Sequence, residues 1–155
     1  MKVKKVISSI LVLLCMATIF VFSHQTAKKS QSLSDSVAFK VLEVKAEVMK
    51  QEVDEVTKEN FAQKTRVFIR KSAHFLIYLV LGILFFFVFR SYGSKRPFLY
   101  ALLCCFLYAC TDEIHQLFVE RRTASVIDVL IDTCGAAVGL GIVYLMTKKK
   151  YLKES

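Results

Sequence analysis

The sequence predicts an all-α membrane protein with four transmembrane helices. Its 155 residues are 55% hydrophobic, and the apolar residues are concentrated in four runs. Each run approaches the roughly 20 residues that a helix needs to cross a bilayer, whereas a soluble bundle would show apolar stripes along one face of each helix. The predicted crossings are residues 6–24, 66–90, 98–118 and 125–146 of a single domain that covers residues 1–155.

The first apolar run, Val6 to Phe22, follows three lysines and therefore also fits the start of a signal peptide. The run is longer than the usual apolar region of such a peptide. The residues after it, Ser23, His24 and Gln25, offer no small-x-small cleavage site. We therefore expect this run to be retained as the first transmembrane helix.

Residues 25–65 form a charged segment between the first and second crossings. Within it, Val37, Val41, Val44 and Val48 recur at helical spacing, which predicts an amphipathic helix over residues 34–57. Such a helix lies on the membrane surface or packs against the other helices.

The net charge of +9 comes largely from basic residues beside the apolar runs. This placement is typical of topology signals and lipid contact, and it excludes nucleic acid as the expected partner. Basic residues with few acids flank both termini and the short link at residues 91–97, which predicts cytoplasmic termini and an extracytoplasmic segment 25–65. The five cysteines lie in apolar runs without a Cys-x-x-Cys pair, so we interpret them as small hydrophobic residues.

This topology brings four separate polar groups to one depth of the outer leaflet. The first and third helices end on the outer side, and the second and fourth begin there. Ionisable residues inside a membrane cost roughly 2.5–3.5 kcal/mol each and mark functional sites. The convergent groups are Ser23 with Gln25, Arg70 to Tyr78, Asp112 to Gln116, and Arg122 to Asp132.

Four carboxylates in this region cannot all stay ionised without nearby cations. The carboxylates belong to Asp112, Glu113, Asp128 and Asp132, and the expected cationic partners are Arg70, Lys71 and Arg122. Arginine on the outer side also suits bidentate binding of a phosphate or carboxylate.

Several of these residues also have structural interpretations. Ser125 and Asp128 have the spacing of a helix capping box. His74 fits a packing histidine, and Tyr78 an interfacial aromatic residue. The pair Gly135 and Gly139 is typical of a close helix–helix contact. His24 and His115 carry no specific signal.

At these residues the chain resembles the VanZ-like family of small bacterial membrane proteins. The matching motifs are Phe22-Ser23-His24-Gln25, Arg70-Lys71-Ser72-Ala73-His74-Phe75 with Tyr78, Asp112 to Phe118, and Arg122 through Asp128 and Asp132 to Gly135. Where family members often have a Pro-Gly-like turn, this chain has Glu120-Arg121. The resemblance implies a cell-envelope protein of the bacterial cytoplasmic membrane, from a family linked to reduced susceptibility to glycopeptide antibiotics such as teicoplanin.

Two main hypotheses follow. In the first, the site binds an anionic envelope molecule, such as a lipid-linked cell-wall or teichoic-acid component, or an antibiotic with a lipid tail; the proposed ligand-binding residues are Arg70, Lys71, Tyr78, Gln116 and Arg122. In the second, the protein is an intramembrane hydrolase or transferase that uses acid–base catalysis or a divalent metal; the candidate catalytic residues are His74, Asp112, Glu113, Asp128 and Asp132. A proton-coupled transporter is a third hypothesis, which four helices without a repeat disfavour.

Overall fold

The structure, a computed structural model, describes residues 2–24, 32, 36–37, 39–44, 55–119 and 124–154. In this part of the chain all regular structure is helical. The long helices are α1 (Lys2–Ser23), α3 (Glu55–Ser91), α4 (Pro97–Gln116) and α5 (Val126–Glu154). Each contains a stretch long and apolar enough to cross a membrane, which confirms the predicted all-α class and its four membrane-length helices.

The largest difference from the predicted boundaries is at the start of α3. This helix begins at Glu55, well before the predicted start at residue 66. Residues 55–65 are rich in Glu, Lys, Gln and Ala, which favour helix. The segment contains no Gly or Pro that would interrupt the helix. The apolar stretch itself is Val67–Ser91, so α3 joins a charged extension to a membrane-length segment without a break.

The predicted amphipathic helix over residues 34–57 is only partly covered by the structure. Residues 36–37 and 39–44 are helical, residues 45–54 lie outside the described part, and residues from 55 onward belong to α3. Val37, Val41 and Val44 are exposed, and Leu42 is the buried residue instead. The valine face therefore does not pack against the protein in the described residues.

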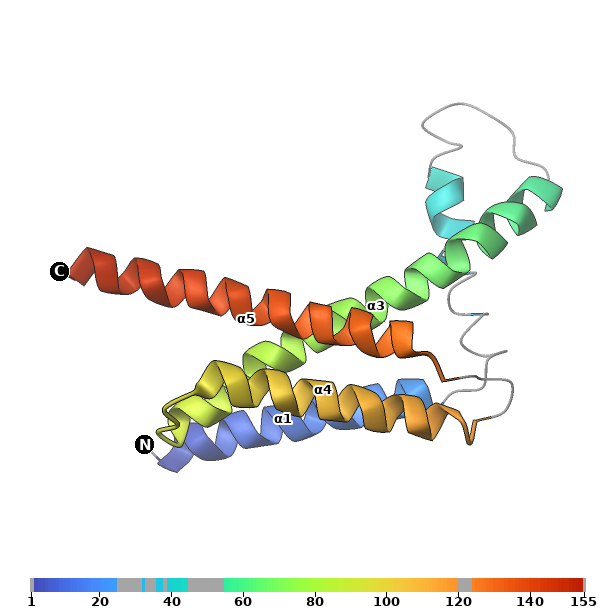
Figure 1. Cartoon of the computed structure of the whole chain (residues 1–155). Helices are drawn as coiled ribbons and strands as arrows, with labels where there is room; N and C mark the ends of the chain where they lie inside the picture. Colours follow the sequence, from blue (N-terminus) through green and yellow to red (C-terminus); the bar gives the residue numbers. More distant parts are fainter. Residues whose placement is uncertain are drawn as a thin grey trace.

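The four long helices alternate in direction, so both termini lie at the same end (Figure 1). At the opposite end, the end of α1, the first turns of the α3 membrane stretch, the end of α4 and the start of α5 come together. Helix α3 is central, because it contacts α1, α4 and α5.

The closest helix contact joins α3 to α5 and depends on glycine. A Cβ atom on Gly135 would collide with the carbonyl oxygen of Phe75, and one on Gly139 would collide with that of Leu79. Both pairs are one helical turn apart, so the two helices run in the same direction in a fixed register. This confirms the predicted packing role of the two glycines.

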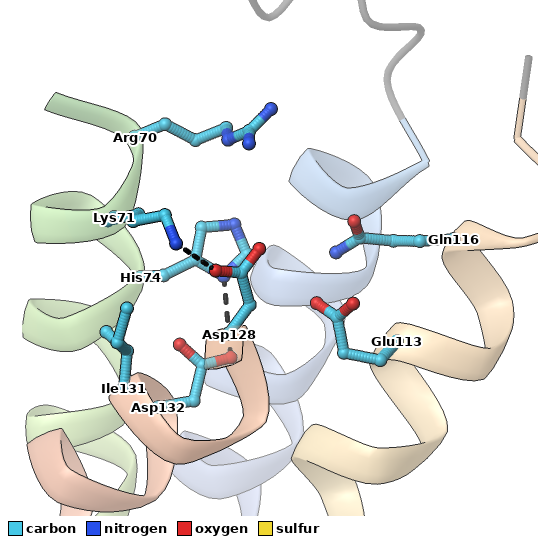
Figure 2. A pocket seen from close by; sticks show the side chains of 8 residues that line it. All are labelled: Arg70, Lys71, His74, Glu113, Gln116, Asp128, Ile131 and Asp132. Atoms are coloured by element: carbon cyan, nitrogen blue, oxygen red, sulfur yellow. Dashed lines mark hydrogen bonds and ion pairs between the residues drawn. The ribbon is translucent and has the colours of Figure 1, made fainter. Parts of the chain in front are cut away.

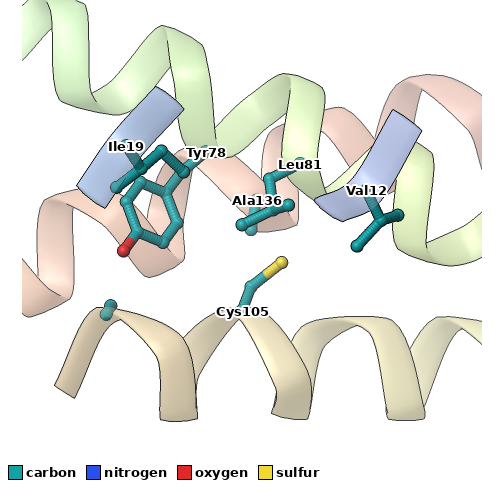
Figure 3. Close-up of a cluster of buried hydrophobic side chains, with 7 residues drawn as sticks. Val12, Ile19, Tyr78, Leu81, Cys105 and Ala136 are labelled. Atoms are coloured by element: carbon teal, nitrogen blue, oxygen red, sulfur yellow. The ribbon is translucent and has the colours of Figure 1, made fainter. Parts of the chain in front are cut away.

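The core is built from apolar side chains of all four helices (Figure 3). Its buried members include Ile19 of α1, Tyr78 of α3, Cys105 of α4 and Ala136 of α5. All five cysteines are free; four are buried or half-buried, in agreement with their interpretation as small hydrophobic residues, whereas Cys134 is exposed. Large apolar side chains are exposed along the outside of each helix, which is the surface expected of a protein solvated by lipid.

Candidate functional site

A polar pocket lies at the end of the bundle opposite the termini. It has an empty volume of about 260 Å³, its open mouth included. Helices α3, α4 and α5 supply its lining, which consists of Arg70, Lys71, His74, Glu113, Gln116, Asp128, Ile131 and Asp132. Figure 2 shows these side chains directed toward one another across the pocket.

The pocket rim contains an ion pair between α3 and α5. The Lys71 ammonium donates to Asp128 Oδ1 at 2.7 Å, and both side chains are partly exposed. Arg70 lies beside this pair at the mouth (Figure 2) and has no ion-pair partner among the described residues. One rim cation is therefore neutralised within the protein, and the other faces the opening.

Glu113 links the pocket to the start of α5. Its Oε2 accepts a hydrogen bond of 2.7 Å from the backbone N–H of Ser125, just before the first residue of α5. In a capping box this N–H would be bonded by the residue at the Asp128 position. Here Glu113 of α4 takes that place, and Asp128 binds Lys71. The other oxygen of Glu113, Oε1, is buried and has no hydrogen-bond partner in the described structure.

We call the cluster of His74, Asp112 and Asp132, one from each of α3, α4 and α5, the pocket floor; His74 and Asp132 line the pocket, and Asp112 lies next to them outside the lining. Each offers one ligand atom, and these atoms lie within 4.8 Å of one another. His74 Nδ1 lies 3.6 Å from Asp132 Oδ2, which is an ion-pair distance but too long for a hydrogen bond. Asp132 is fully buried, and neither of its oxygens has a hydrogen-bond partner among the described residues.

Asp112 is held by two hydrogen bonds that both reach its Oδ2 atom. Ser23 Oγ, at the end of α1, donates at 2.8 Å, and Gln116 Nε2 donates at 3.3 Å. Ser23 is fully buried, so this contact is shielded from solvent and fixes α1 to α4. It makes α1 part of the support of the site although α1 does not line the pocket.

Tyr78 lies one helical turn deeper than His74 and is not part of the pocket lining. It packs in the core, and its hydroxyl is buried without a hydrogen-bond partner among the described residues. The nearby Tyr108 hydroxyl instead donates to the carbonyl oxygen of Met16 at 2.7 Å.

The structure brings most of the predicted site residues together. Those at the pocket or its floor are Arg70, Lys71, His74, Asp112, Glu113, Gln116, Asp128 and Asp132. Tyr78 lies next to them in the core. Arg122, predicted to bind a ligand, lies outside the described residues.

A histidine pair beside the site was not predicted. His24 Nδ1 and His115 Nε2 are 3.2 Å apart, and their rings stack with centroids separated by 5.4 Å. Phe20 packs against both rings. Both histidines lie at helix ends on the same side of the bundle. Their contact could have been predicted from this placement in the sequence.

Four membrane-length helices, three of which line an ionisable pocket at one end of the bundle, fit a multi-pass membrane protein with a polar site. The VanZ/LLP1 family model matches residues 8–147, nearly the whole chain. The chain therefore belongs to the VanZ/LLP1 family. No curated protein and no solved structure matches it.

Proposed function

We propose that this protein resides in the bacterial cytoplasmic membrane and binds the anionic head group of an envelope lipid or lipid-linked molecule in its polar pocket. The observation that carries the proposal is the cationic rim of Arg70 and Lys71 within an apolar protein surface. Arg70 suits a phosphate or carboxylate because its guanidinium donates two parallel hydrogen bonds.

The surroundings of the pocket favour a ligand that carries a lipid tail. Four apolar side chains near the site are more than half exposed: Phe68 on α3, Ile114 on α4, Phe118 just after α4 and Ile127 on α5. A lipid could place its acyl chains against such side chains while its head group enters the pocket. An effect on glycopeptide susceptibility would, on this proposal, act through the bound envelope lipid.

A second candidate function is hydrolysis or transfer at a lipid-linked phosphate or ester. The observation that favours it is the group of buried acids beside His74 at the pocket floor. A histidine and a carboxylate in this arrangement can move a proton to or from a bound ester, or can hold a metal that polarises it.

The binding proposal is tested by mass spectrometry of lipids that co-purify with the protein in mild detergent. We expect a phosphate- or carboxylate-bearing lipid to be enriched with the wild type and reduced about tenfold by Arg70→Gln, the equivalent of about 1.4 kcal/mol of binding free energy. Arg90→Gln is the matched control, because Arg90 is an exposed arginine at the opposite end of the same helix. Equal lipid enrichment in the wild type and both variants would contradict the proposal.

A further inference from the structure

We propose that His74, Asp112 and Asp132 bind a divalent transition-metal ion such as Mn²⁺ or Zn²⁺ at the pocket floor. These residues come from three helices and bring one nitrogen and two oxygen ligands within 4.8 Å of one another. Imidazole together with carboxylate is a common ligand set for such ions. The role of this ion rests on the proposed function, because the ion would help the site to bind an anionic head group.

The state of Asp132 is the second observation that indicates a ligand. Its carboxylate is fully buried, and both oxygens lack a hydrogen-bond partner among the described residues. An ionised carboxylate in such a place costs several kcal/mol unless a cation compensates it. His74 Nδ1 lies 3.6 Å from Asp132 Oδ2, a separation that two ligands of one metal ion can have.

Asp112 is oriented as a metal ligand would be. Ser23 and Gln116 both donate to Oδ2, and no hydrogen bond to Oδ1 is present in the described structure. Hydrogen bonds to one carboxylate oxygen fix the direction of the other, which is how second-shell groups position metal ligands. Ser23 would therefore support the ion without touching it.

The charge of the site also favours a bound cation. Asp112, Glu113, Asp128 and Asp132 face only two cationic side chains, Arg70 and Lys71, in the described part of the pocket. A divalent ion would balance the four carboxylates. An anionic head group could then enter the pocket without meeting uncompensated acids, and one of its oxygens could complete the coordination of the ion.

The test is a titration of the full-length purified protein with MnCl₂ after treatment with a chelator. Free Mn²⁺ is measured by electron paramagnetic resonance, and total metal by elemental analysis. We expect one saturable site per chain in the wild type. Binding should be lost in His74→Ala and Asp132→Asn and weakened about 10- to 100-fold in Ser23→Ala. His115→Ala is the matched control and should bind like the wild type, because His115 contacts His24 instead of the floor cluster.

Loss of binding must be separated from loss of the fold. Asp132→Asn keeps the size of the side chain and removes a buried charge, so its melting temperature without metal should equal or exceed that of the wild type. Absence of saturable binding by the wild type, or equal affinity in Asp132→Asn, would overturn the inference. Lipid enrichment is measured separately, with and without the chelator. If the wild type binds no metal but still enriches the lipid after chelation, the metal inference fails and the proposed lipid binding stands. Loss of lipid enrichment would count against the proposed function instead.

Discussion

At the scale of single residues, the site combines satisfied and unsatisfied polar groups. The Lys71–Asp128 pair and the Ser23–Asp112 hydrogen bond stabilise the fold, because each joins two different helices. Asp132 and one oxygen of Glu113 are buried without hydrogen-bond partners in the described structure. Buried polar groups without a hydrogen-bond partner lower the stability of the fold, and their presence in one pocket indicates a function.

Tyr78 provides a residue-scale prediction. Its hydroxyl is buried without a hydrogen-bond partner among the described residues, whereas its ring packs in the core. We expect Tyr78→Phe to keep the packing and to raise the free energy of unfolding by about 1 kcal/mol, because it removes an unsatisfied polar group. Unfolding in detergent measures this change. A drop in stability, together with loss of the co-purifying lipid, would show instead that the hydroxyl orients the ligand.

At the scale of elements, the glycine contact between α3 and α5 sets the register of the site. The pairs Lys71–Asp128 and His74–Asp132 precede the contacts of Gly135 and Gly139 along the same two helices. Along α5 the members of these pairs, at positions 128, 132, 135 and 139, each lie about one turn further from the pocket mouth. A change in the separation of the two helices at the glycines would therefore reach the pocket.

We expect Gly135→Ala to destabilise the protein by about 1–3 kcal/mol, because the added methyl group meets the backbone of Phe75. The same variant should also weaken metal binding, because it moves Asp132 away from His74. Gly141→Ala is the matched control on α5, where a Cβ atom has nothing within 4 Å. Thermal unfolding and the Mn²⁺ titration measure both effects. Equal stability of the two variants would contradict the tight contact.

Sequence patterns predicted the four membrane-length helices but not the contacts between their side chains. The apolar runs predicted the four membrane-length helices because length and hydropathy are local properties. The extension of α3 back to Glu55 was not predicted, because charged helix-forming residues continue a membrane helix without any change in local preference. The Ser125–Glu113 bond and the His24–His115 pair were missed because both join residues of different helices. Helix alternation predicts which ends meet but not which side chains pair.

At the scale of the whole molecule, the pocket and the two chain termini lie at opposite ends of the bundle. The positive-inside rule predicts that the termini, which are flanked by basic residues, are cytoplasmic. In that orientation the pocket would open to the extracytoplasmic side.

A fluorescent protein fused to the C-terminus tests this orientation, because it matures in the cytoplasm and remains dark after export by the general secretory route. We expect fluorescent cells, and protection of the fused domain from protease added to spheroplasts. A dark, protease-sensitive fusion would place the pocket on the cytoplasmic side.

Site-specific photo-crosslinking tests most directly whether the pocket binds an anionic lipid head group. A photoactivatable amino acid replaces Ile131, which lines the pocket, or Leu145, which is exposed near the other end of α5. We predict that position 131 captures one class of phosphate- or carboxylate-bearing lipid and that Arg70→Gln reduces this adduct about tenfold. Position 145 should capture the bulk membrane lipids and be insensitive to Arg70→Gln. The same lipids at both positions, unaffected by Arg70→Gln, would contradict the account.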